Sequence, residues 1–215
     1  MKSITTSFNQ TNFRLLKVIN LIKPASILFI SLSLITGIFY PLIITVISQL
    51  AFKHEANGSL IMHQGNIIGS ELIGQNFNQP QYFWSRPSAA SNFANNGLAS
   101  GGSNLSVDNP TLIKNTQQRV NHLNQYNNLD NKHKLIPIDL VTSSASGLDP
   151  HISIQGAYYQ AQRIANYRNI PIIKIYQIIE KNIQTSKFNI IGENYINVLK
   201  LNLELDNLLY LYDQN

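Results

Sequence analysis

Serine, aspartate and histidine side chains gather in one short stretch of the chain. Within nine residues the sequence contains Ser143, Ser144, Ser146, Asp149 and His151. These are the side-chain types of a nucleophile, base and orienting carboxylate, as in serine hydrolases. The serines lack the Gly-x-Ser-x-Gly setting that exposes a nucleophile on a sharp turn. The competing interpretation is architectural, because Asp149 followed by Pro150 is a common way to begin a helix.

A second stretch of chemical interest is the glycine-rich segment 100–105, SGGSNL. Adjacent glycines let the backbone approach an anion or another chain closely. The spacing matches neither Gly-x-Gly-x-x-Gly nor a P-loop, and no lysine follows, so a structural turn or a protein contact is favoured over phosphate binding. With Ser103 or Ser146 as the nucleophile and His151 as the base, the chain would be a membrane-anchored extracytoplasmic serine hydrolase. We weigh this function as an alternative to a non-catalytic role.

The histidines do not form a metal-binding pattern. They are scattered over the sequence, with no His-Glu-x-x-His motif and no i, i+4 pair: His54, His63, His122, His133 and His151. Cysteine is absent, which excludes disulfides, thiolate ligands and a cysteine nucleophile. We expect no catalytic residue, no metal site and no directly bound cofactor in this chain.

Several local patterns predict the elements that position these residues. The polar stretch 53–58 is typical of a linker, and the apolar runs 59–62 and 66–69 predict a β-hairpin. A further short element is expected at 72–80. Residues 85–109 are rich in Ser, Asn and Gly and predict a long loop.

The second half of the chain predicts more helix than strand. Asn109-Pro110 marks the start of a helix with apolar residues recurring to Tyr126, and Asp149-Pro150 marks the start of a second that runs to Arg168. A third helix is expected over 172–185. A buried strand is expected over 136–142. A half-buried strand is expected where Leu199, Leu201, Leu203 and Leu205 alternate with polar residues. The fold class is therefore α+β, with a single mixed α/β domain over 53–215.

An uncharged apolar run occupies residues 25–52. At about 1.5 Å per helical residue it reaches about 42 Å, enough to cross a hydrocarbon core of about 30 Å. Gly37 and Pro41 lie inside it and are tolerated where a neighbouring helix covers the backbone. We predict a transmembrane helix at 25–52, preceded by a basic tail at 1–24.

The charges around this run predict its orientation. Lys2, Arg14, Lys17 and Lys23 precede it, and the first acidic residue is Glu55. Basic flanks stay in the cytoplasm, so the domain is expected outside, in the periplasm of a single-pass inner-membrane protein. Four of the 16 basic residues precede the span, which leaves 12 against 11 acidic residues in the outer part. This balance gives no basic patch for a nucleic acid.

Five stretches together are similar to one known family. They are 69–89 (GSELIGQNFNQPQYFWSRPSA), 100–105 (SGGSNL), 136–153 (IPIDLVTSSASGLDPHIS), 160–168 (QAQRIANYR) and 192–206 (GENYINVLKLNLELD). In this order, after one N-terminal span, they resemble the C subunit of the Kdp potassium-transporting P-type ATPase. The departures from the family pattern at Ala145, Ile154 and Ser106-Val107 alter turn chemistry without removing a charged or polar anchor.

The resemblance implies a non-catalytic accessory subunit of an ATP-driven, high-affinity potassium uptake complex. The implied partners are a channel-like potassium-translocating subunit, an ATP-hydrolysing P-type subunit and a small membrane peptide, which together handle ATP and K+. The subunit is expected to stabilise the assembly and to raise the ATP affinity of the catalytic subunit, indirectly from outside the membrane.

The resemblance also places the functional residues. The expected partner-contacting or structural motif comprises Gly101, Gly102, Ser103, Asn104, Leu105, Asp139, Thr142, Ser146, Gly147, Asp149, Pro150 and His151. Gly37 and Pro41 are expected to pack against partner helices.

Overall fold

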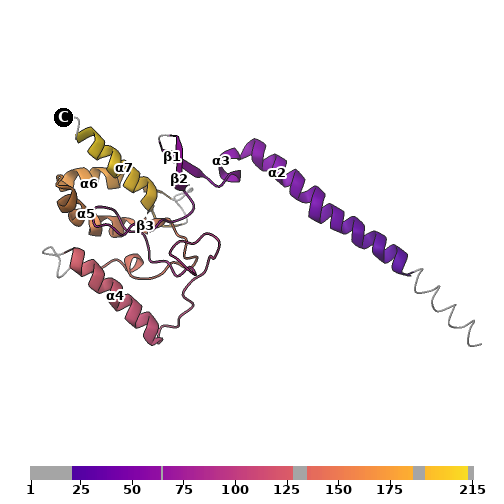
Figure 1. The fold of residues 1–215 in the computed structure, drawn as a ribbon, viewed down its shortest axis with the longest axis horizontal. Helices are drawn as coiled ribbons and strands as arrows, with labels where there is room; N and C mark the ends of the chain where they lie inside the picture. The colour runs from indigo at the N-terminus through magenta and orange to yellow at the C-terminus, as the bar shows by residue number, and fades with distance from the viewer. Residues whose placement is uncertain (1–20, 64, 128–134, 186–191, 213–215) are drawn as a thin grey trace, which may run out of the picture. The chain divides into compact units, whose positions relative to one another are not determined.

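A computed structural model of the 215-residue chain describes residues 21–63, 65–127, 135–185 and 192–212 (Figure 1). The chain divides after Asn57 into two compact units. The first contains a long apolar helix and the second a domain of mixed helix and sheet, which confirms the predicted fold class. Residues 1–20 of the predicted basic tail lie outside the described residues.

The first unit is dominated by one helix, Leu21–Ala51. By length and composition this helix could cross a membrane, and its apolar window is exposed along its whole length. It contains a five-residue π-helical turn, η1 (Ile35–Phe39), followed by α2 (Tyr40–Ala51). A short helix, α3 (Lys53–Ala56), follows where the sequence predicted a linker.

Pro41 explains the π-helical turn. Proline lacks an N–H, and its ring crowds the carbonyl four residues earlier, which here belongs to Gly37. The helix widens at this point, because the Tyr40 N–H donates to the Ile35 carbonyl five residues back. A Cβ at Gly37 would meet nothing within 4 Å, so the packing of Gly37 and Pro41 against a partner helix stays a prediction.

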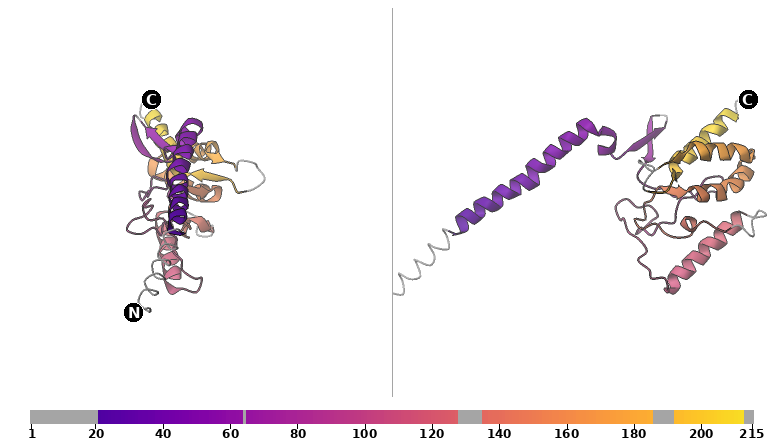
Figure 2. Two further views of the ribbon diagram at one scale, coloured as in Figure 1. Left: turned by 90° about the vertical axis from the view of Figure 1, so that its right-hand side faces the viewer. Right: turned by 180° about the vertical axis from the view of Figure 1, so that it is seen from behind.

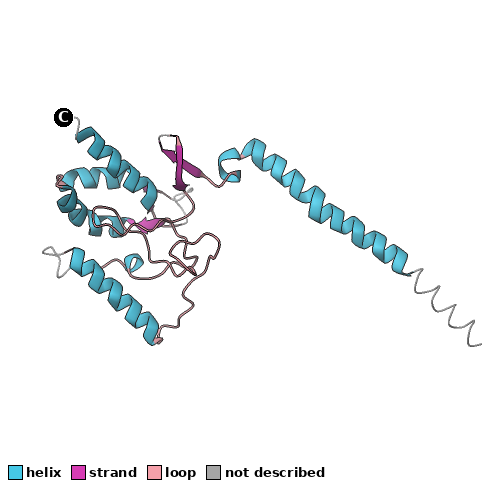
Figure 3. Ribbon diagram, in the orientation of Figure 1, coloured by secondary structure: helices cyan, strands magenta, loops and turns pink. Residues whose placement is uncertain are grey.

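The second unit begins with the predicted hairpin. Strands β1 (Leu60–His63) and β2 (Asn66–Ser70) pair antiparallel, with Met62 opposite Ile67. The segment 72–80, expected to hold a further short element, runs without helix or strand. It continues into the predicted loop 85–109, and both lie within the long loop trace that joins β2 to α4 in Figure 3.

The helices begin and end where local chemistry dictates. α4 (Pro110–Tyr126) starts as predicted, with the Asn109 side chain accepting a hydrogen bond from the Thr111 N–H at 2.9 Å. α5 (Ile154–Arg168) ends at Asn169, which takes a left-handed conformation with φ of 53°. α6 (Ile172–Lys181) follows, shorter than the predicted 172–185.

Two predictions before α5 were wrong. Residues 136–142 form no strand and contain only the 3-10 turn η2 (Ile138–Leu140), in which Ile138 is 74% exposed. The helix expected from Pro150 begins at Ile154 instead. Its N-cap is Ser153, whose Oγ accepts the Gly156 N–H at 2.9 Å. The residues in between form strand β3 (His151–Ser153).

The strand predicted over 199–205 was also wrong, because this segment lies in helix α7 (Val198–Tyr212). Over residues 198–208, where the structure describes the side chains, the buried ones are Val198, Leu199, Leu201, Asn202 and Leu205. Residues 198, 201, 202 and 205 recur at helical spacing. Because the polar Asn202 lies on the buried face, the inner face of the helix is not marked by apolar residues alone. The alternating leucines therefore resembled the two-residue period of a strand.

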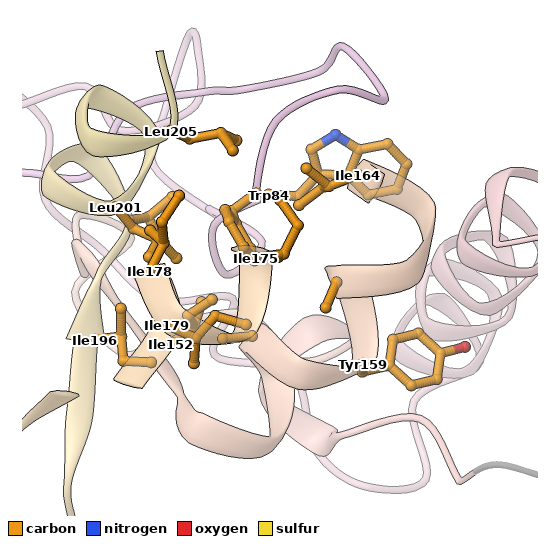
Figure 4. Close-up of a cluster of buried hydrophobic side chains, with 14 of the residues drawn as sticks. Trp84, Ile152, Tyr159, Ile164, Ile175, Ile178, Ile179, Ile196, Leu201 and Leu205 are labelled. Atoms are coloured by element: carbon orange, nitrogen blue, oxygen red, sulfur yellow. The ribbon is translucent and has the colours of Figure 1, made fainter. Parts of the chain in front are cut away.

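A small sheet and three helices enclose the core. The sheet order is β3-β5-β4, with β5 (Tyr195–Asn197) antiparallel to both β3 and β4 (Ile183–Gln184). Figures 1 and 2 show α5, α6 and α7 gathered beside this sheet, with α4 on the other side of the loop segments. Figure 4 shows the core side chains, including Ile152, Ile175, Ile196 and Leu201, meeting between these elements.

Candidate functional site

The two stretches singled out for chemistry lie against each other. The Gly101 N–H donates to the Ser146 carbonyl at 2.8 Å, and the Ser100 hydroxyl donates to the same carbonyl at 3.0 Å. A Cβ at Gly102 would stand 2.8 Å from the Ala145 carbonyl oxygen. The lack of a side chain at Gly102 therefore permits a close backbone contact within the domain.

The loop 85–90 packs against these two stretches at Gly147. This residue has a φ of +67°, and a Cβ on it would lie 2.6 Å from the Gly101 carbonyl oxygen and 2.9 Å from the Ala90 nitrogen. The Ser88 hydroxyl donates to the Gly147 carbonyl at 2.7 Å. We call residues 85–90, 100–105 and 143–151 the three-loop cluster.

Asp149 anchors the cluster electrostatically. Its Oδ2 accepts from Arg86 Nη1 at 3.0 Å, and its Oδ1 accepts from the His151 N–H at 3.0 Å with His151 Nδ1 at 3.5 Å. Burial by itself raises the pKa of Asp149. The hydrogen bonds from His151 and the positive charge of Arg86 outweigh burial and hold this pKa below its usual 3.8.

The other predicted residues also have structural partners. Asp139 Oδ2 accepts the Ser153 N–H at 2.7 Å, just before α5. The Thr142 hydroxyl donates to the Ile138 carbonyl at 2.8 Å, and the Pro150 carbonyl accepts the Val198 N–H at 2.9 Å.

The end of the glycine-rich segment faces solvent more openly. Ser103 and Asn104 are exposed, and Leu105 is half-buried. Asn104 has a φ of 52°, a conformation that asparagine tolerates better than most residues. Ser103 and Asn104, together with the exposed Ser146, are the residues of the predicted motif most accessible to another molecule.

The geometry does not support a serine hydrolase. Ser146 Oγ accepts the Leu148 N–H at 3.1 Å, as in a local serine turn, and the His151 ring lies 4.4 Å from the Tyr195 ring between centroids. Among the described residues no hydrogen bond joins a serine hydroxyl to His151, so a nucleophile–base pair is not assembled. Within these residues there is also no group of three His, Cys, Asp or Glu side chains placed to hold a metal ion.

A buried arginine holds several segments of the domain together. The sequence alone did not indicate this role. Arg163 of α5 is 1% exposed. It donates to the Tyr82 carbonyl at 3.0 Å, to Asn127 Oδ1 at 3.1 Å and to Gln160 Oε1 at 2.7 Å, and also to the Pro80 carbonyl. Its guanidinium carbon lies 3.8 Å from the centre of the Trp84 ring. Burial lowers the pKa of Arg163 to about 9, which leaves it charged at neutral pH.

Two buried amides hold the same extended segment. Asn202 of α7 accepts the Phe83 N–H at 2.9 Å and donates to the Phe83 carbonyl at 3.0 Å. Gln160 of α5 does the same for Trp84, at 2.8 and 3.2 Å. Each amide replaces a neighbouring strand as a hydrogen-bonding partner. The segment that carries Phe83 and Trp84 into the core is therefore fixed without a sheet.

A signal for these residues exists in the sequence. Gln160 and Arg163 interrupt the apolar face formed by Ala157, Ala161 and Ile164. A polar side chain on a buried helical face needs a partner. What the pattern does not reveal is that the partner is a loop 76 or more residues earlier in the chain.

The lowered pKa of Asp149 predicts how the stability of the domain changes at acid pH. Because the folded-state pKa is depressed, the contribution of Asp149 is present well above 3.8 and is lost as the pH falls through the lower folded-state value. We expect Asp149→Asn to cost about 1–2 kcal/mol at pH 7 and to cost less as the pH drops below 3.8. Urea unfolding at pH 7 and in steps below pH 4 measures this, with the exposed Asp108→Asn as control. An Asp149→Asn deficit independent of pH would contradict the assignment.

These observations define a class of protein with one helix able to cross a membrane and one α/β domain, in which the glycine-rich and serine-rich segments of the motif pack against each other. Comparison with known proteins narrows it. The family profile described as KdpC, the c chain of the K+-transporting ATPase, matches residues 22–207.

Individual relatives agree with this match. The KdpC subunit of the potassium-transporting ATPase of Yersinia enterocolitica is 50% identical over 185 residues, 86% of this chain and 92% of the relative. The corresponding subunit of Photorhabdus laumondii is 49% identical over 187 residues, 87% of this chain and 96% of the relative. The chain belongs to the KdpC family. It is a subunit of a K+-transporting ATPase and so has partner subunits.

Proposed function

We propose that this subunit is a non-catalytic accessory component that stabilises the pump and raises the ATP affinity of its ATP-hydrolysing subunit. The observation that carries the proposal is the three-loop cluster. Its polar groups are engaged by one another, as in the Asp149–Arg86 pair and the Gly101–Ser146 hydrogen bond. Such a cluster presents a fixed surface, and catalysis would instead need a reactive side chain held ready by a base.

The loop surface also carries apolar side chains that favour a protein partner. Phe93 is 63% exposed and Leu98 is 99% exposed, both in the stretch between two of the clustered loops. Burial against a partner would remove this apolar area from water. The exposed Ser103 and Asn104 could add polar contacts at its edge.

Topology makes the proposed effect on ATP indirect. The basic N-terminal tail favours a cytoplasmic N-terminus and a periplasmic domain in the inner membrane. ATP is hydrolysed on the other side, so the domain would act by steadying the assembly at the potassium entrance of the channel-like subunit. The anchoring helix, packed against partner helices near Gly37 and Pro41, raises the effective concentration of the domain at its partner, so a weak outer contact suffices. The small membrane peptide is the third proposed partner.

The test is the purified pump with the double variant Phe93→Ser and Leu98→Ser. We expect less of this subunit to be recovered with the complex, and the ATP KM of the subunit-depleted pump to rise several-fold at unchanged kcat. Ile173→Ser is the matched control, because Ile173 is an apolar residue of α6 that is 56% exposed. Normal recovery together with a normal ATP KM in the double variant would refute the proposed contact.

A further inference from the structure

A pocket of about 440 Å³ lies between α4 and the loop segment 76–88. Its polar wall includes Arg86, Asn115, Gln118, Arg119 and His122, and Trp84 forms part of its apolar wall. No aspartate or glutamate is among the described residues that line it. The pocket is therefore rich in hydrogen-bond donors and contains no negative side chain.

Arg119 brings a positive charge that no carboxylate among the described residues neutralises. Its guanidinium donates to the Val141 carbonyl at 2.9 Å and to Ser143 Oγ at 3.1 Å. A guanidinium has five N–H donors, so two bonds leave others free. In the described part of the chain Arg119 has no carboxylate within ion-pair distance, whereas Arg86 and Arg168 each have one.

The surroundings of the pocket reinforce this positive potential. Arg163 lies against the Trp84 ring at 3.8 Å and also has no carboxylate partner among the described residues. Burial lowers the pKa of His122, and the charge of Arg163 lowers it further. Among the described residues, the buried Nε of Arg86 has no hydrogen-bond partner. A negative charge in the pocket would stabilise the Arg163 guanidinium and offer Arg86 Nε an acceptor. His122, whose pKa is lowered, faces the pocket as a neutral imidazole that can donate a hydrogen bond.

We propose that this pocket binds an organic carboxylate. The donors of Arg119 and of the amides of Asn115 and Gln118 suit a carboxylate, and Trp84, Phe77 and Leu123 offer a wall for the carbon body attached to it. The carboxylate belongs either to a free small acid or to an aspartate or glutamate side chain of a partner polypeptide. The two sources share this chemistry and differ in the size of the attached group.

Trp84 is the single tryptophan of the chain and lines the pocket, so its fluorescence reports binding directly. The experiment titrates the full-length chain in neutral detergent with succinate, with a capped Ala-Asp-Ala tripeptide and with inorganic phosphate. Gln118→Glu places a negative charge at the pocket wall. Gln117→Glu places the same charge one residue away on α4, outside the pocket lining.

We expect a saturable change in Trp84 fluorescence with succinate or the peptide, weakened about fivefold or more by Gln118→Glu and little changed by Gln117→Glu. A tighter response to the peptide assigns the site to a partner side chain, and a tighter response to succinate assigns it to a free acid. Either result supports the pocket. No saturable response to either carboxylate, a response to phosphate alone, or equal weakening by both variants would overturn the proposal.

Discussion

Replacing Arg163 by methionine should destabilise the domain by about 3–5 kcal/mol. Methionine matches the length of the arginine stem but makes none of its hydrogen bonds. The Tyr82 carbonyl and Asn127 Oδ1 would be left without this donor, and the Trp84 ring would lose its stacked guanidinium. Buried polar groups deprived of a partner cost more than the bond that was lost.

Urea unfolding of the full-length chain, followed by Trp84 fluorescence, measures this loss. Lys174→Met is the control, because it also removes one positive charge, from a half-buried position on α6. We expect the control to shift stability by no more than about 0.5–1 kcal/mol. Equal stability of Arg163→Met and the wild type would mean that the buried hydrogen bonds do not hold residues 80–84 in place.

The second large effect is expected from Gly147→Ala. A methyl group at this position would meet two backbone atoms, at 2.6 and 2.9 Å, and the φ of +67° is strained for alanine. Backbone atoms cannot move aside as a flexible side chain can, so the three loops must separate. We expect a loss of about 2–4 kcal/mol and, if the cluster is the proposed contact, a reduced recovery of the subunit with the pump.

Gly101→Ala provides a matched control within the same cluster. A Cβ at Gly101 meets nothing within 4 Å, and its φ is not positive. We expect stability within about 0.5 kcal/mol of wild type and normal assembly. Equal stability and equal assembly of the Gly147→Ala and Gly101→Ala variants would show that the close packing of the loops at Gly147 is not important for the domain.

The elements with strong local signals were predictable. The long apolar run, the hairpin at 60–70 and the helix capped by Asn109 all follow from patterns within a few residues. The errors arose where distant partners decide the outcome. Asn202 is buried because it pairs with Phe83, which lies 119 residues away, and this placed a polar residue on the inner face of a helix. Asp149 bonds to His151 and Arg86 and does not cap a helix, which no local rule distinguishes.

The resemblance named residues for the candidate site, but the sequence could not give the contacts between them. The sequence indicated Gly101, Ser146 and Asp149 through a resemblance, and the structure brings their segments together. The pairing of Arg86 with Asp149 and the buried contacts of Arg163 were not predicted, because the partners lie 63 and 81 residues away in the chain. Spacing within a motif cannot show such contacts.

The proposal that the domain raises ATP affinity from outside the membrane is tested most directly by finding on which side of the membrane the domain lies. The chain has no cysteine, so Ser106→Cys introduces one thiol at an exposed loop position and Ser7→Cys introduces one in the basic tail. We predict that a membrane-impermeant maleimide labels Ser106→Cys in intact spheroplasts and labels Ser7→Cys only after lysis. The reverse pattern would place the domain in the cytoplasm, and it would contradict an action on ATP affinity from outside.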